Sequence, residues 1–357
     1  MPNALIVFNM LQKLKKVFSN DIGIDLGTAN TLVYLKDHGI VINEPSVVAV
    51  NQKTGQIVAV GTEAKQMLGR TPGHIKAIRP LVDGVISDYE VTEEMLSYLI
   101  RKTESFSKKF LGPRVVIGIP SGVTNVESRA VYDAAKSAGA REVYLVEEPM
   151  AAAIGIRLPV NEPVGSMIID IGGGTTDIAV ISLGGIVRSK NLKIAGDQFN
   201  IDIIAHLKDE FKLLVGEKTA ETIKIGLGGV LSNNGDHMPV RGRDLVTGLP
   251  KEIHITGDTI KEAIGPSVMV LVDGVKEILE TTPPEVVGDI MNNGIILSGG
   301  GALLRGLDML IQKTLGIPVY VAEDPLTAVA RGTGMILDNL ALYEEALLKV
   351  DGDAVLK

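Results

Sequence analysis

The stretch that decides the fold is Asp170-Ile171-Gly172-Gly173-Gly174-Thr175, and a shorter form of it, Asp25-Leu26-Gly27-Thr28, stands 170 − 25 = 145 residues earlier. Each follows a short apolar run and leads into another, so each predicts a strand, a tight turn and a second strand. Glycines let exposed backbone N–H groups cradle phosphate oxygens. An aspartate just before such a turn would repel phosphate unless a hydrated divalent cation lay between them. Together the two turns predict a nucleotide–Mg²⁺ site in a cleft between two similar halves, although a plain structural hairpin would explain either turn alone.

The composition is that of a globular chain long enough for two domains. It has 357 residues, of which 45% are hydrophobic and 22% charged. The net charge of 35 − 43 = −8 argues against a general nucleic-acid-binding surface. There is no cysteine, which excludes disulfides and thiolate metal sites, and no run of about 18 uncharged apolar residues that could span a membrane.

The first twenty residues differ from the rest, because they carry three lysines and no acid before Asp21. Their apolar side chains follow helical spacing, and the charge comes after the apolar stretch, which is the reverse of a signal peptide. We expect residues 1–19 to form an amphipathic helix that binds an anionic membrane surface; a helix docked on the protein's own core, or a frayed tail, is the alternative. A second contact could come from the loop around residues 108–114, unless that loop is a helix end packed into the core. The membrane-contacting residues would be Val7, Met10, Leu11, Leu14, Val17, Phe18, Phe110 and Leu111.

The expected elements follow the same order twice along the chain. The first half shows successive strands over residues 20–50, a helix at 92–109, a strand at 115–119, a helix at 125–138, a strand at 143–146 and a helix from residue 148. The second half shows strands at 167–171, 178–182 and 186–194, a helix at 198–214, a strand at 294–298 and a helix near 303–315. We expect a first domain over 20–157, to which helices of 325–357 return, and a second over 158–324. The latter holds an inserted subdomain at about 197–266, polar and irregular from about residue 216.

Three further features could belong to a nucleotide site. Glu148, between a strand and a helix of small residues, could orient a water toward a γ-phosphate, or could be a charge favoured at a helix N-terminus. The turn Ser298-Gly299-Gly300-Gly301 could let adenosine approach the backbone, or could be only a loop. Glu221 and Lys224, three residues apart, could bind ligand or form a surface ion pair.

Four longer strings carry a resemblance to a known family, namely residues 21–31, 65–73, 148–153 and 298–308. With them, over about residues 19–345, the chain resembles the actin, heat-shock chaperone and sugar-kinase ATPase superfamily. Within it the chain is most similar to the MreB family of rod shape-determining bacterial actin homologues. The resemblance implies an α/β, actin-like ATPase fold, with two domains that have duplicated ribonuclease-H-like cores around a nucleotide cleft.

The resemblance also implies a role for each matching residue. ATP would be bound with Mg²⁺, which Asp25 and Asp170 would hold through water, and Glu148 and Thr175 would position the hydrolytic water, with Asp170 beside them. One departure is Thr222, where the family usually has arginine. The nucleotide-binding residues would be Asp25, Gly27, Thr28, Ala29 and Asn30 in the first turn, Gly172, Gly173, Gly174 and Thr175 in the second, and Glu221, Thr222, Ile223, Lys224, Ser298, Gly299, Gly300 and Gly301 around adenosine.

The function implied is that of a bacterial cytoskeletal protein with slow, polymerisation-coupled ATP hydrolysis. Its filaments, paired antiparallel protofilaments, would lie on the cytoplasmic face of the inner membrane. There they would organise cell-wall synthesis and maintain rod shape with partners such as RodZ and MreC/MreD, and without nucleic acid. A chaperone ATPase would need a long C-terminal peptide-binding extension, whereas 357 − 325 = 32 residues follow Pro325. A small-molecule kinase would need an acceptor pocket with a general base, and no such group of residues stands out.

Overall fold

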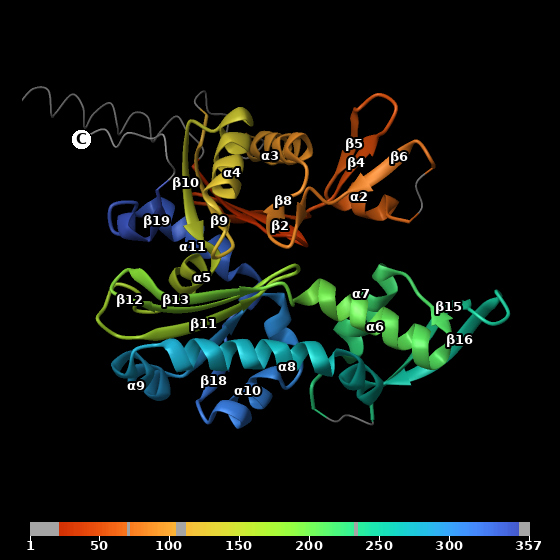
Figure 1. Ribbon diagram of the computed structural model, residues 1–357. Coiled ribbons are helices and arrows are strands. Elements are labelled where there is room, and N and C mark those ends of the chain that lie inside the picture. The colour runs from red at the N-terminus through yellow and green to blue at the C-terminus, as the bar shows by residue number, and fades with distance from the viewer. Residues whose placement is uncertain (1–20, 70–71, 105–111, 232–234, 350–357) are drawn as a thin grey trace, which may run out of the picture. The chain divides into compact units, whose positions relative to one another are not determined.

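The computed structural model describes residues 21–69, 72–104, 112–231 and 235–349 (Figure 1). The chain divides into two compact units, one made of the described residues of 1–158 and 327–357 and the other of those of 159–326. All the membrane-contacting residues expected above fall outside the described residues. Among the described helices, none is both long and apolar enough to cross a bilayer.

The first unit is built on a six-stranded sheet in the order β19-β10-β9-β1-β2-β3. The strands β1, β2 and β3, which come first in the chain, form an antiparallel meander. On the other side of β1, β9 and then β10 extend the sheet in parallel. Its strands are β1 (Ile22–Leu26), β2 (Asn30–Leu35), β3 (Gly39–Pro45), β9 (Arg114–Ile119), β10 (Glu142–Glu147) and β19 (Leu347–Leu348). Parallel strands inside a sheet are covered on both faces, which explains why β9 reads as an unbroken apolar run.

Helices cover both faces of this sheet. Ile22 and Ile24 point into a core shared with α3 and α4, whereas Gly23, between them, faces Thr333 of α11. The helices are α3 (Tyr89–Glu104), α4 (Asn125–Ser137), α5 (Glu148–Gly155) and α11 (Ala328–Asp338), with short 3₁₀ turns η2 (Pro325–Thr327) and η3 (Glu344–Ala346). A smaller part of the unit holds β4 (Val48–Asn51), β5 (Ile57–Val60), α2 (Thr62–Met67), β6 (Ile75–Ile78), β7 (Leu81–Val82) and β8 (Val85–Ile86).

The second unit repeats the strand order of the first in its main sheet, β13-β12-β11-β17-β18. Again three antiparallel strands come first in the chain and two parallel strands extend the sheet from the first of them. The strands are β11 (Ser166–Ile171), β12 (Thr176–Ser182), β13 (Gly185–Leu192), β17 (Ile295–Ser298) and β18 (Val319–Val321). The helices are α6 (Gly196–Phe211), α7 (Glu217–Leu227), α8 (Gly257–Thr281), α9 (Pro284–Asn293), α10 (Leu307–Leu315) and the 3₁₀ turn η1 (Gly300–Leu303). A small sheet is formed by β14 (Leu213–Leu214), β15 (His237–Asp244) and β16 (Pro250–Thr256).

The stretch expected to be irregular, residues 216–266, is instead largely regular. It contains α7, the β15–β16 hairpin and the start of α8 (Figure 1). Helix α8 is 25 residues long in all and continues past Pro266 without ending. A proline inside a helix removes one hydrogen bond and normally kinks or ends it. Here the apolar face of α8, including Ile264, Val268 and Leu271, is fully buried against the second unit's core, and that packing outweighs the local preference.

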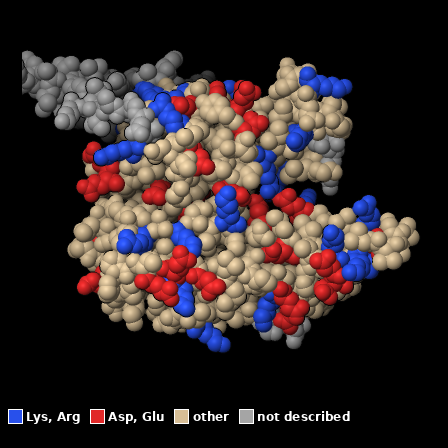
Figure 2. Space-filling model, in the orientation of Figure 1, with Lys and Arg blue, Asp and Glu red and all other residues tan. Residues whose placement is uncertain are grey.

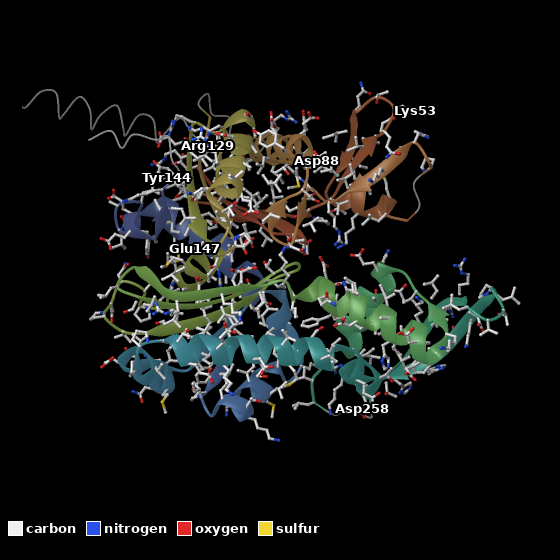
Figure 3. All side chains as sticks on the ribbon, viewed as in Figure 1. Lys53, Asp88, Arg129, Tyr144, Glu147 and Asp258 are labelled. Atoms are coloured by element: carbon white, nitrogen blue, oxygen red, sulfur yellow. The ribbon has the colours of Figure 1, made fainter. Side chains whose placement is uncertain are left out.

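Other element ends also differ from expectation. Helix α3 begins at Tyr89 rather than at residue 92, because the Asp88 carboxylate accepts a hydrogen bond from the Val91 N–H at 3.1 Å (Figure 3). Helix α6 ends at Phe211, because Lys212 adopts a left-handed conformation and the chain then joins β14. The helix expected from residue 303 begins at Leu307, after Gly306 with φ +79°.

Helices α5 and α11 pack with their backbones in direct contact. A Cβ atom on Gly332 would lie 1.8 Å from the Ala151 carbonyl oxygen, and one on Gly155 would lie 2.0 Å from the Ala328 carbonyl oxygen. Both distances are far inside van der Waals contact and both neighbours are backbone, which cannot move without displacing a helix. This contact holds α11 against α5, the helix that begins at Glu148.

We therefore predict that Gly332→Ala lowers the free energy of unfolding by about 3 kcal/mol, through overpacking of this helix pair. The measurement is urea denaturation followed by circular dichroism. The matched control is Gly288→Ala, since a Cβ on Gly288 in α9 meets nothing within 4 Å. That variant should be more stable than the wild-type chain by about 0.5–1 kcal/mol. Equal midpoints for Gly332→Ala and the wild-type chain would show that α5 and α11 do not pack this closely.

Candidate functional site

The first glycine turn connects β1 and β2 and is held in place by residues from further along the chain. The Ser46 hydroxyl donates to the Gly27 carbonyl oxygen at 2.5 Å, and the Ser46 N–H donates to the Ala29 carbonyl oxygen at 3.1 Å. The Thr28 hydroxyl oxygen accepts from the Gly84 N–H at 3.0 Å. With these contacts the turn has a fixed shape before any ligand binds.

Asp25 and Glu148 flank one small residue in the first unit. Gly118 on β9 lies beside Asp25 in the β1–β9 register, and a Cβ on it would be 3.5 Å from Glu148 Cγ. Glu148 is 8% exposed and begins α5 directly after β10. The neighbouring Glu147 instead lines a cavity of about 460 Å³ with Arg129 and other residues of α4, and its burial raises the pKa of its carboxyl (Figure 3). Of the two adjacent glutamates, therefore, Glu148 is the one near Asp25.

The second glycine turn connects β11 and β12 and is tied to the start of α6. The Gly172 N–H donates to the Thr175 carbonyl oxygen at 2.9 Å, which closes the turn. The Gly172 and Gly173 carbonyl oxygens accept from the N–H groups of Gly196 and Asp197, at 3.2 and 2.8 Å. These bonds occupy the turn's carbonyl groups on the α6 side.

Asp170 is a buried carboxyl with an unsatisfied oxygen. It is 6% exposed, and its Oδ1 has no hydrogen-bond partner among the described residues. Burial, and then the charge of Asp177 directly opposite on β12, raise the pKa of Asp170 to about 7, against the effect of Ser298. Both carboxylate oxygens of Asp177, in contrast, have a hydrogen-bond donor, because the Asn191 amide donates to them at 3.0 and 3.1 Å.

These residues fit a magnesium ion held through water. A buried carboxylate oxygen without a donor calls for a cation or a cation-bound water, and Mg²⁺ prefers oxygen ligands and keeps several of its waters. The described parts of the chain hold no group of three or more His, Cys, Asp or Glu arranged as a metal cage. A single buried carboxylate is compatible with an ion whose remaining ligands are water and phosphate.

The third glycine turn lies against the second. Strand β17 runs parallel to β11, with Ser298 beside Asp170. Gly299 has φ +78°, and a Cβ on it would lie 2.8 Å from Asp170 Oδ1 and 2.4 Å from the Ile171 carbonyl oxygen. A Cβ on Gly301 would lie 2.1 Å from Ile171 Cγ2. Only glycine allows this approach, so the two turns form one continuous backbone surface next to the Asp170 carboxyl.

Glu221 and Lys224 belong to a network and are not an isolated surface pair. On α7, Lys224 Nζ donates to Glu221 Oε2 at 2.8 Å and to the Gly196 carbonyl oxygen at 2.7 Å. Between them, Thr222 is exposed and its hydroxyl donates to the Lys218 carbonyl oxygen, while Ile223 is 1% exposed in the core. The side chains of Glu221 and Lys224 therefore face the start of α6, and Ile223 can offer a ligand only its backbone.

The site residues expected from the sequence thus fall into two groups. The second unit brings together Asp170, the turn at 172–175, the turn at 298–301, Glu221 and Lys224, and the first unit brings together Asp25, residues 27–30 and Glu148. A cleft shared by both groups stays a prediction. Sequence reasoning missed Ser46, Asp177 and Asn191, and also Asn200 of α6, whose amide donates to Glu221 Oε2 at 2.7 Å. Asp177 had a usable signal, because a hairpin that turns at 172–175 places it opposite Asp170.

Comparison with known proteins identifies the family. The MreB/Mbl protein family model matches residues 19–345. The chain belongs to the MreB/Mbl family. It is 51% identical to the cell shape-determining protein MreB of Escherichia coli K12, over 94% of this chain and 98% of that protein. It is also 51% identical to the cell shape-determining protein Mbl of Bacillus subtilis 168, over 91% and 97%.

Solved structures agree with this assignment. MreB5 of Spiroplasma citri bound to ADP matches with a TM-score of 0.86 and 40% identity, over 90% of this chain and 97% of that one, and its AMPPNP-bound form matches with a TM-score of 0.85. The MamK double helical filament, at 22% identity and a TM-score of 0.77, shares the fold. The MreB/Mbl chain therefore has the α/β actin-like fold that the sequence predicted, with the same strand order in both units.

The raised pKa of Asp170 predicts how the nucleotide-free chain responds to pH. The pKa of Asp170 is about 7 in the folded chain and 3.8 ordinarily. Between pH 3.8 and pH 7, therefore, the folded chain keeps a proton on Asp170 that the unfolded chain has already released. Stability should therefore fall as pH rises from about 4 to 7. Asp170→Asn lacks this penalty, and at pH 8 it should be more stable than the wild-type chain by up to about 4 kcal/mol, at about 1.4 kcal/mol per pKa unit.

The measurement is urea denaturation at pH 5 and pH 8 in EDTA without nucleotide, with the exposed Asp209→Asn as the matched control. The advantage of Asp170→Asn should shrink toward pH 5, while Asp209→Asn follows the wild-type chain at both. An advantage equal at both pH values would contradict the shifted pKa.

Proposed function

We propose that this MreB/Mbl chain is an actin-like cytoskeletal protein that binds ATP with Mg²⁺, hydrolyses it slowly and polymerises into filaments that maintain cell shape. The observation that carries the proposal is the unsatisfied buried oxygen of Asp170, next to two glycine turns that present bare backbone. It is supported by 40% identity to an MreB5 whose structures carry ADP and AMPPNP. Its relatives at 51% identity are named for determining cell shape.

Each part of the chain would bind a different part of the nucleotide. The N–H groups of the turns at 27–30 and 172–175 would bind phosphate oxygens, and Asp25 and Asp170 would hold Mg²⁺ through water. The ion, when bound, neutralises phosphate charge. Glu221, Lys224 and the turn at 298–301 would contact adenosine. Lysine and arginine side chains are mixed with acidic ones over the face shown in Figure 2, so we expect binding to rest on these turns rather than on a broad basic surface.

Glu148 and Thr175 would position the attacking water. Glu148 is mostly buried at the start of α5 beside Asp25, where a carboxylate can accept a hydrogen bond from water and align it with the γ-phosphate. Thr175 is 5% exposed, and its carbonyl oxygen accepts from the Gly172 N–H, so the residue is fixed in the second turn, where its hydroxyl would contact the attacking water. Hydrolysis would be slow in a monomer, because the two residues belong to separate units that polymerisation would bring into register.

Self-association would be head to tail. A heterologous contact that does not close on itself generates a filament, and nucleotide state can change filament stability through contacts that differ between the two states. Residues 1–19, with Phe110 and Leu111, would attach paired antiparallel protofilaments to the cytoplasmic face of the inner membrane. There the filaments would organise wall synthesis with partners such as RodZ and MreC/MreD.

Sedimentation tests this function. The full chain with Mg²⁺–ATP should pellet above a critical concentration, and removing Mg²⁺ with EDTA should return it to the supernatant. In the same assay, vesicles with anionic lipid should increase the pelleted fraction, and deletion of residues 2–18 should reduce that increase but leave polymerisation in solution. A chain that stays in the supernatant with Mg²⁺–ATP at every concentration is not a filament-forming protein. If the deletion variant binds the vesicles as fully as the wild-type chain, the anchor lies elsewhere.

Glu148→Gln should bind ATP within about threefold of the wild-type affinity and release phosphate at least about tenfold more slowly, because the amide cannot accept the proton of the attacking water. Phosphate release from polymerising protein is the measurement. Glu147→Gln is the matched control. This adjacent, half-buried glutamate lines the cavity beside α4, so its substitution should leave turnover unchanged. Normal turnover in Glu148→Gln would remove Glu148 from the mechanism.

A further inference from the structure

Asn200 is a buried amide that holds the Glu221 carboxylate. It lies in the second turn of α6 and is 2% exposed. Its Nδ2 donates to Glu221 Oε2 at 2.7 Å, and the same oxygen accepts from Lys224 Nζ at 2.8 Å. Two donors on one oxygen fix the carboxylate in a single orientation, and the shorter, more buried side chain of Asn200 is the more rigid of the two.

The network connects this carboxylate to the second glycine turn. Lys224 Nζ also donates to the Gly196 carbonyl oxygen at 2.7 Å, and the Gly196 N–H donates to the Gly172 carbonyl oxygen at 3.2 Å. A Cβ on Gly196 would lie 3.2 Å from Lys224 Nζ and 3.6 Å from Gly173 Cα, so the chain is compact at this point. Three hydrogen bonds therefore separate the Glu221 carboxylate from the backbone of the turn.

This position suits one part of a nucleotide. A carboxylate repels phosphate and accepts hydrogen bonds, so it must face a donor on the ligand. In a nucleotide the sugar comes directly after the phosphates, and its vicinal hydroxyls are donors. A carboxylate held a short way from a phosphate-binding turn is therefore placed for the ribose.

We propose, on the basis of the function proposed above, that Asn200 is a positioning residue that holds Glu221 toward the ribose hydroxyls. Asn200 itself does not contact the nucleotide. It makes Glu221 discriminate ATP from 2′-deoxy-ATP, because a carboxylate fixed in one orientation loses a hydrogen bond when the 2′-hydroxyl is missing and cannot turn to replace it. A carboxylate free to rotate would discriminate less.

The test compares the Mg²⁺-dependent affinities of ATP and 2′-deoxy-ATP by calorimetry on the full chain. The wild-type chain should prefer ATP by at least about tenfold. Asn200→Ala, and Asn200→Asp, which keeps the volume and puts a second carboxylate against Glu221, should reduce this ratio at least about fivefold. The reduction should come from weaker ATP binding, with 2′-deoxy-ATP affinity changed less than about twofold. Glu221→Gln should reduce the ratio similarly, and adding Asn200→Ala to it should have no further effect.

Gln198→Ala is the matched control. Gln198 lies on the same helix, but its amide donates to Asp202 at 2.8 Å rather than to Glu221, so the ratio should stay at the wild-type value. A variant that only loosened α6 would weaken both nucleotides equally and leave the ratio unchanged.

The outcomes separate this inference from the proposed function. If the ratio is unchanged in both Asn200 variants but falls in Glu221→Gln, Asn200 does not position Glu221. If the wild-type chain binds both nucleotides equally, Glu221 does not read the ribose, and the inference fails while ATP binding stands. If the wild-type chain binds no Mg²⁺–ATP, the proposed function fails and this inference with it.

Discussion

The rest of the site depends on the buried carboxyl of Asp170, whose Oδ1 has no hydrogen-bond partner among the described residues. Asp170 sits near the end of the central strand of the second unit, with β12 on one side and β17 on the other. On β12 a second carboxyl makes ionisation of Asp170 harder, whereas Ser298 on β17 has the opposite effect. The glycine turn after β17 approaches the Asp170 carboxyl closely and adds to its burial. Burying a lone charge is costly unless a partner accompanies it, so this arrangement favours either a proton on the carboxyl or a cation from outside.

The two sheets have the same strand order but use their aspartates differently. Asp25 and Asp170 both stand in the first strand of a meander, opposite the second strand. Beside Asp25 the parallel neighbour contributes Gly118, which leaves room for Glu148, and beside Asp170 it contributes Ser298 and a glycine turn. Under the proposed function, one unit would supply the carboxylate that orients water and the other the backbone surface that binds phosphate.

Sequence reasoning succeeded where the local pattern and the tertiary structure agree. The strand–turn–strand units around residues 25 and 170 could be predicted, because apolar runs, aspartate and glycine all favour the same geometry. It failed where packing outweighs local preference, as at Pro266 inside α8, or where one left-handed residue sets the end or the start of a helix, as at Lys212 after α6 and Gly306 before α10. Asn200 could not be found, because its role depends on contact with a residue 21 positions away on another helix. The carboxylate at 177 was within reach and was overlooked.

The network around Asn200 bears on how nucleotide binding would affect the phosphate turn. The carbonyl groups of Gly172 and Gly173 are bonded to the start of α6, and the same start is bonded through Lys224 to Glu221. A ligand that engages Glu221 therefore restrains the helix end that supports the turn, and a ligand that engages the turn restrains the same helix end from the other side. Such coupling is reciprocal, because both contacts favour a single arrangement of α6 and reduce its freedom together. Under the proposed function, adenosine would pre-order the phosphate turn, and the triphosphate would hold Glu221 in place for the ribose.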